Sequence, residues 1–188
     1  SSADLTFKLP VADGSANQLL KTDGSGNLGF VAATAGPAIT MVDCWGFTQS
    51  ATYADDNHIT NYWVRRTGRH GGNVGSAMTQ SSGVFAFPQT GLYLIIMQFG
   101  FYAHSGGQNY AGVKMDYSED SGSSYTSDVS NYYTSMDNTA YGRLIAQETL
   151  DVTTTNIRIK FQLDLQNNIT LQGGQGRSSI IFIKYGDT

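Results

Sequence analysis

The chain has 188 residues and a net charge of −4, which is the size of one large domain, or of one domain with a short appendage. Only 14% of its residues are charged, against about 25% in an average soluble protein, and an aromatic content of 12% argues against disorder. Uncharged polar residues replace the charges, with 18 Ser, 19 Thr, 11 Asn and 11 Gln beside 22 Gly. A helical protein would need more Ala, Leu, Glu and Lys, so the composition predicts an all-β protein.

Charge and cysteine content exclude further classes. The 11 Lys and Arg are scattered, so we expect no nucleic-acid surface. The longest apolar run, residues 92–97, is too short to span a bilayer, so no membrane insertion is expected. Cys44 is the single cysteine, which excludes an intrachain disulfide and a cysteine metal cluster.

Residues 1–36 contain a weak tandem repeat of ten residues. Residues 9–18 align with residues 19–28, and Leu, Asp, Gly, Ser and Asn recur in both units. Each unit is a short apolar stretch followed by Asp-Gly, which is a strong turn signal. Two units cannot bury a core alone, so we expect a fibrous stalk of β-repeats that needs partner chains. A flexible linker is the alternative, and residues 32–37 are the expected junction to a second domain, 37–188.

From residue 39 onward the hydrophobic pattern has a period of two. Residues 157–165 and 111–118 alternate apolar and polar side chains, as strands with one face in a core and one in water do. Less regular strands are expected near residues 39–49, 58–65, 84–88, 99–104 and 142–150. Gly-rich or Ser-rich segments separate them, and eight or more strands in about 150 residues suit a jelly-roll β-sandwich.

Two strands, residues 92–97 and 180–183, are instead apolar on both faces. One face of a sandwich sheet meets the other sheet and the second is normally wet. We therefore expect the second face to be covered by another copy of the chain, so that one alternating set lies in the core and the other at a subunit interface. A covering loop is the alternative.

The run from Gly83 to Gln98 resembles the signature of the tumour necrosis factor and complement globular-head superfamily. The matching residues are Phe85, Gly91, Leu92, Tyr93, Leu94, Ile95 and Gln98. The resemblance implies a jelly roll that forms a homotrimer, with its inner sheet around the threefold axis. It places Leu92, Leu94, Ile96 and Gln98 at the trimer interface. It places Phe85, Tyr93, Ile95 and Met97 in the sandwich core.

Residues 9–28 are similar to segments that recur in tail-fibre and structural proteins of marine bacteriophages. Such a segment often precedes a C-terminal head domain. Together the two resemblances imply the distal end of a trimeric viral fibre, with a stalk followed by a head. The implied location is the tail-fibre tip of a virion, outside the cell.

A search for catalytic or metal-binding patterns finds none that is specific. His58, His70 and His104 have no metal-ligand spacing. Residues 55–57 and 118–122 could supply oxygens to calcium, but neither has the ligand pattern of a known loop. There is no nucleophile motif, and no carboxylate pair can be assigned. We expect no enzyme activity, no metal site and no cofactor.

Recognition is the function that these observations leave. Tyr and Trp among Ser, Gly and Asn are typical of adaptable binding surfaces, and flat aromatic faces also suit sugar rings. The candidate receptor-binding residues are Tyr62, Trp63, Arg65, Arg66, Tyr110, Tyr132 and Tyr133. Trp63 and several of the tyrosines could instead fill the core. The sequence thus predicts a receptor-binding head that attaches to a host surface glycan or outer-membrane protein. The alternatives are a structural domain that trimerises or caps a fibre or capsid decoration, and a cellular trimeric adhesin.

Overall fold

The structure is a computed structural model that describes residues 6–33, 39–68, 71–103, 109–136, 140–174 and 176–188. The chain forms two compact units, Ser1–Ala38 and Ile39–Thr188, which we call the N-terminal unit and the head. The strands, in chain order, are β1 (Gln18–Thr22), β2 (Leu28–Ala32), β3 (Met41–Phe47), β4 (Ala51–Tyr53), β5 (Trp63–Arg65), β6 (Asn73–Val74), β7 (Thr79–Ser81), β8 (Val84–Ala86), β9 (Gly91–Ala103), β10 (Tyr110–Ser118), β11 (Thr126–Ser135), β12 (Tyr141–Val152), β13 (Arg158–Leu165), β14 (Ile169–Leu171) and β15 (Ser179–Gly186).

The N-terminal unit contains an antiparallel hairpin of β1 and β2. The second Asp-Gly forms its turn, where the Asp23 carboxylate accepts hydrogen bonds from the backbone N–H groups of Ser25 and Asn27 at 2.8 and 3.1 Å. None of residues 6–33 is buried, and large apolar side chains such as Leu9 and Leu19 are exposed. The hairpin therefore leaves its apolar side chains uncovered, and the fibrous stalk stays a prediction.

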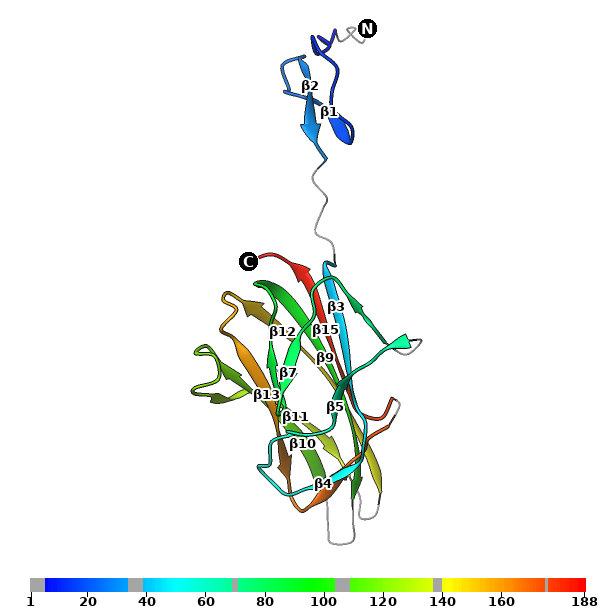
Figure 1. The fold of residues 1–188 in the computed structure, drawn as a ribbon, viewed down its shortest axis with the longest axis vertical. Coiled ribbons are helices and arrows are strands. Elements are labelled where there is room, and N and C mark those ends of the chain that lie inside the picture. The colour runs from blue at the N-terminus through cyan, green and yellow to red at the C-terminus, as the bar shows by residue number, and fades with distance from the viewer. Residues whose placement is uncertain (1–5, 34–38, 69–70, 104–108, 137–139, 175) are drawn as a thin grey trace, which may run out of the picture. The chain divides into compact units, whose positions relative to one another are not determined.

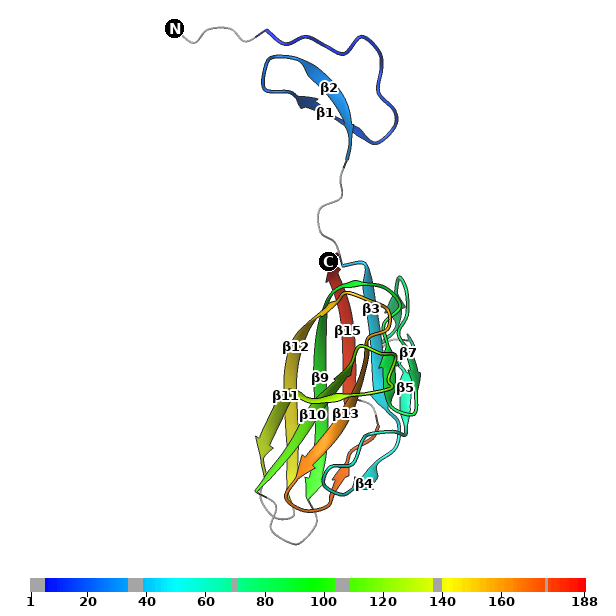
Figure 2. The same ribbon diagram turned by 90° about the vertical axis from the view of Figure 1, so that its left-hand side faces the viewer.

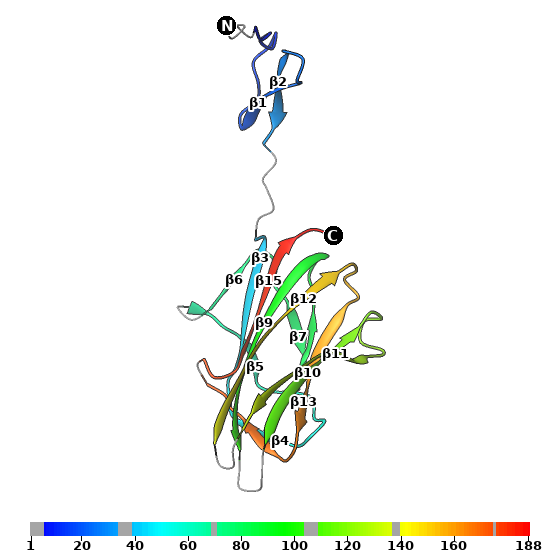
Figure 3. The ribbon, with the colours of Figure 1, turned by 180° about the vertical axis from the view of Figure 1, so that it is seen from behind.

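The head is a sandwich of two antiparallel sheets (Figures 1 and 2). The smaller sheet has the order β11-β10-β13-β8-β7. The larger, eight-stranded sheet has the order β4-β14-β9-β15-β3-β5, with β12 paired to β9 and β6 paired to β3. Figure 3 shows β3, β15, β9 and β12 as neighbours in this larger sheet. The described residues contain no α-helix, so the chain has the all-β jelly-roll architecture that its composition and periodicity predict.

Aromatic side chains fill the space between the sheets. Phe85 is fully buried and makes edge contacts with Trp45 and Trp63, with ring centroids 5.4 and 5.7 Å apart. Phe161 of β13 and Phe182 of β15 pack on the same ring from the two sheets. Contacts of this geometry contribute beyond the burial of apolar area, so the aromatic cluster anchors one sheet to the other.

The structure corrects three strand assignments. Residues 99–103 continue β9 rather than forming a separate strand, because β9 pairs with β12 over its whole length. The predicted strand 58–65 shrinks to β5, while residues 56–59 instead bond to the edge of β13. Residues 126–135 form β11, which is not among the strands expected from the sequence. Their pairing with β10 stabilises a strand that periodicity does not show.

Candidate functional site

The outward face of the eight-stranded sheet is apolar over its central strands. The register places Leu94 beside Ile183 and Ile183 beside Val42, so that one row crosses β9, β15 and β3. The next row contains Ile96, Ile181 and Cys44. These side chains are partly exposed, and no described segment of the chain lies across them to remove them from water. An apolar sheet face of this extent is typical of a protein interface.

The four residues predicted for the sandwich core point to the opposite side of this sheet or lie in the facing sheet. Phe85, Tyr93, Ile95 and Met97 each have 0% exposure. The Tyr93 hydroxyl donates to the Gln89 carbonyl at 2.9 Å, and burial raises its pKa to about 12. The residues predicted for the interface, Leu92, Leu94, Ile96 and Gln98, alternate with them on the outward face and are partly exposed.

Two of the predicted receptor-binding residues have structural contacts. Trp63 is 8% exposed, and its indole N–H donates to the Ile59 carbonyl at 3.0 Å, so it fills the core, which was the alternative for this residue. Arg65 pairs with the buried Asp43 through Nε at 2.8 Å and lies over the Trp45 ring, 4.7 Å from its centroid. Its side chain remains 32% exposed, so contact of Arg65 with a receptor stays a prediction.

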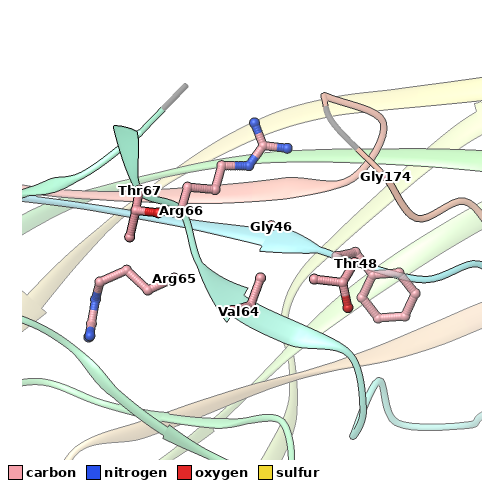
Figure 4. A pocket seen from close by; sticks show the side chains of 8 residues that line it. Gly46, Thr48, Val64, Arg65, Arg66, Thr67 and Gly174 are labelled. Carbon is pink, nitrogen blue, oxygen red and sulfur yellow. The ribbon is translucent and has the colours of Figure 1, made fainter. Parts of the chain in front are cut away.

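The neighbours of these two residues remain on the surface. Tyr62 is 40% exposed and contacts the Phe47 ring edge-to-face at 5.7 Å. Arg66 extends away from Arg65 and lies beside a hollow of about 340 Å³ at the edge of the eight-stranded sheet (Figure 4). Val64 and Thr48 also line this hollow.

The predicted tyrosines lie elsewhere, on the five-stranded sheet. The rings of Tyr110 and Tyr133 are 5.6 Å apart, and the half-exposed Tyr133 donates its hydroxyl to Asp164 at 2.8 Å. Lys114 pairs with the same carboxylate at 3.0 Å. Burial would raise the pKa of Asp164, but hydrogen bonds from Tyr133 and Lys114 outweigh burial and lower it. This arrangement gives a flat aromatic and charged surface on the outer face of the smaller sheet.

Tyr132 is separate from this surface. Its hydroxyl donates to Glu148 at 2.7 Å and to the Gln147 carbonyl at 3.1 Å, so it joins β11 to β12 across the edges of the two sheets. The structure therefore divides the seven predicted residues among the core, the eight-stranded sheet and the five-stranded sheet. Tyr132 and Tyr133 lie in β11, a strand that the sequence did not predict.

Further exposed side chains lie on the outward face of the eight-stranded sheet, and they are not among the predicted site residues. Tyr141 is 72% exposed, and its ring lies 4.9 Å from that of Tyr102. Arg143 follows two positions later on the same face of β12. Alternation along β12 places Tyr141 and Arg143 on one face, but only the pairing of β12 with β9 brings Tyr102 beside them.

The candidate metal ligands engage protein groups. His58 Nε2 lies 2.7 Å from the buried carboxylate of Asp116. Asp120 accepts hydrogen bonds from Ser124 and Ser118, which lower its pKa. Within the described residues, no three His, Cys, Asp or Glu side chains are arranged to hold a metal ion. His70 and His104 lie outside the described residues.

Comparisons with known proteins identify the fold. The Eiger TNF protein of S. frugiperda superposes with a TM-score of 0.61 at 12% identity, over 81% of this chain and 96% of that one. Murine APRIL superposes with a TM-score of 0.54 at 15% identity, over 77% and 98% of the two chains. The head has the tumour necrosis factor and complement globular-domain fold.

A third solved structure has the same fold. The globular domain of the zebrafish complement 1qA protein superposes on this chain with a TM-score of 0.53 at 5% identity, over 78% and 98% of the two chains. No protein-family model matches the sequence, and no curated protein matches it. No helix in the described part of the chain has the length and apolar character needed to cross a membrane.

Proposed function

We propose that this protein is the receptor-binding tip of a viral fibre, in which the head forms a homotrimer and attaches to a bacterial host. The observation that carries the proposal is the apolar outward face of the eight-stranded sheet. Removing such a face from water stabilises an assembly by about 25 cal/mol for each Å² of apolar area. The tumour necrosis factor and complement fold favours three copies around this face.

The N-terminal unit supports a fibre rather than an isolated head. Its hairpin exposes Leu9, Leu19 and Leu20, which partner chains would cover in a stalk. Its ten-residue repeat is similar to segments of marine phage tail fibres. A trimeric tip carries three copies of every surface site, and several fibres on one particle raise the avidity of weak sites by orders of magnitude.

The structural alternative, a domain that only trimerises and caps a fibre, uses the same outward face. Deletion of residues 37–188 from the virus that encodes the chain distinguishes the two functions. We expect assembled particles that no longer adsorb to the host. Particles that fail to assemble would support the capping function, and particles that assemble and adsorb normally would contradict attachment by this head.

A further inference from the structure

Among the described residues of the head, three arginines stand apart from the other cations. Four of these other cations form ion pairs with aspartates: Arg65, Lys114, Lys160 and Lys184. Arg158 donates to the carbonyls of two neighbouring residues. Arg66, Arg143 and Arg177 have neither an ion pair nor a side-chain hydrogen bond to any described residue. All three lie around one end of the outward face of the eight-stranded sheet, beyond the rows of Leu94 and Ile96 on which the proposed trimer rests. Arg143 pairs with Gly100, Arg177 lies two residues before Ser179, and Nε of Arg66 reaches Gly46.

The turn that follows β14 brings Arg177 to this end. The N–H of Gln172 donates to the Gly100 carbonyl at 2.7 Å, and the N–H of Gly174 donates to the Phe47 carbonyl at 2.8 Å. The side-chain amide of Gln98 donates to the carbonyls of Gly176 and Arg177. These bonds fix the described part of the turn against β9 and β3, and Arg177 is exposed on it.

Arg66 lies on the other side of this turn. A Cβ atom at Gly46 would lie 2.5 Å from Arg66 Nε, and one at Gly71 would lie 2.3 Å from Arg66 Cβ. Because Gly46 and Gly71 have no side chains, they leave room for the Arg66 side chain to lie across the sheet. Its guanidinium borders the hollow that Gly174 also lines (Figure 4).

Arg143 approaches from the opposite edge. It pairs in register with Gly100, and a Cβ atom at Gly100 would lie 2.9 Å from the Arg177 carbonyl oxygen. Arg143 and Arg177 therefore flank the same glycine. Two residues along β12 and β9, the rings of Tyr141 and Tyr102 lie in contact, with Tyr141 mostly exposed. We call Arg66, Arg143, Arg177, Tyr102 and Tyr141 the distal patch.

The distal patch lies at the end of the head opposite to the entry of the chain. β3 begins with Met41 beside Lys184 and ends near Gly46, which lies beside Ser179. Ser179 in turn pairs with Gln98 of β9. The chain thus enters at the end of the eight-stranded sheet where β3 begins (Figures 1 and 3), and the strand register places the arginines toward the other end. A fibre that holds the head by residue 39 would present the distal patch to the host.

We infer that the distal patch binds an acidic polysaccharide of the host surface, an inference that rests on the proposed attachment function. Guanidinium groups form paired hydrogen bonds with carboxylate, sulfate and phosphate oxygens. An exposed tyrosine beside them can stack on the C–H face of a sugar ring. On a chain of net charge −4, a local cluster of unpaired arginines attracts anions that the rest of the surface repels. Assembly in three copies multiplies these contacts along a repeating polymer.

Binding of the purified full-length chain to immobilised polymers tests the inference. We expect binding to polygalacturonate, dextran sulfate or both, weakening as salt rises, and no binding to neutral dextran. The two acidic polymers distinguish a carboxylate from a sulfate ester as the preferred group. Replacing all three arginines (R66Q, R143Q, R177Q) should weaken binding about 100-fold, since each loses charge-assisted hydrogen bonds. Binding to neither acidic polymer would overturn the inference.

A second triple variant separates the distal patch from overall charge. K8Q, K21Q and R158Q remove the same charge at positions outside the patch. We expect this variant to bind within about twofold of the unmodified chain, because its patch is intact. An equal loss in both triple variants would overturn the inference, because it would show attraction by overall charge alone.

The substitution Tyr141→Ala tests whether the distal patch stacks on a sugar ring. It should weaken binding to polygalacturonate about tenfold, as loss of one stacking contact does, while binding to inorganic polyphosphate, which has no ring, stays unchanged. Equal effects on both polymers would contradict recognition of a sugar. Adsorption measured separately distinguishes failure of this inference from failure of the proposed function. A head that adsorbs to host cells but ignores acidic polymers refutes only the inference.

Discussion

Leu94→Glu is expected to dissociate the assembled protein into folded monomers at micromolar concentration. Leu94 lies in the central row of the outward face, beside Ile183, and its side chain points away from the sandwich core. In a trimer, three carboxylates would be moved out of water near one axis, and each costs several kcal/mol without a partner. Size-exclusion chromatography with light scattering measures the mass, and circular dichroism shows whether the monomer is folded.

Thr79→Glu is the matched control for this variant. Thr79 is exposed on β7, an edge strand of the five-stranded sheet, where a carboxylate stays in water. We expect this variant to keep the mass of the unmodified protein. If Leu94→Glu also kept that mass, the outward face of the eight-stranded sheet would not be the interface.

Asp43→Asn is expected to lower the free energy of unfolding by about 3 kcal/mol. The Asp43 carboxylate is fully buried and accepts hydrogen bonds from Arg65 Nε and the Met78 N–H, each at 2.8 Å, and from Trp45 Nε1 at 3.2 Å. An amide has one acceptor oxygen in place of two and presents an N–H group to these donors. The substitution therefore leaves the Arg65 guanidinium beside a neutral, poorly paired group.

Urea unfolding measures this loss, and Asp56→Asn is the control. Asp56 is 68% exposed and pairs with Lys114 at 3.6 Å, so the same substitution there should change the free energy of unfolding by less than about 1 kcal/mol. Equal effects at both positions would show that the Asp43 carboxylate does not hold Arg65, the last residue of β5, in place.

Periodicity predicted the strands of the head in which burial of one face alone sets the alternation of apolar and polar residues. Ile159, Phe161 and Leu163 alternate in β13 because one face meets the aromatic core. The doubly apolar run in β9 predicted a second apolar face, and the described residues leave the side chains of that face partly exposed. The sequence did not predict β11, because this strand is stabilised by pairing with β10, in which Tyr110 lies beside Ser135. Such a long-range contact has no local signature in the sequence.

The candidate site was harder to predict for the same reason. Trp63 and Tyr62 are adjacent in sequence, yet Trp63 begins β5 and is buried, whereas Tyr62 precedes the strand with a φ of 66° and is 40% exposed. Arg65 pairs with Asp43, a partner that only the fold brings near. The distal patch joins residues from β9, β12, the segment after β5 and the turn before β15, so no window of sequence contains it. The superfamily signature predicted the fold, the fibre that the repeat implies stays a prediction, and strand register was needed to find the surface.

The mass of the purified, unmodified chain in solution tests the central claim most directly. Sedimentation equilibrium across a micromolar concentration range should give three chain masses, because the apolar outward face is removed from water only when copies assemble. A single chain mass throughout this range would contradict the account, since the rows of Leu94 and Ile96 would then remain exposed to water in the functional protein.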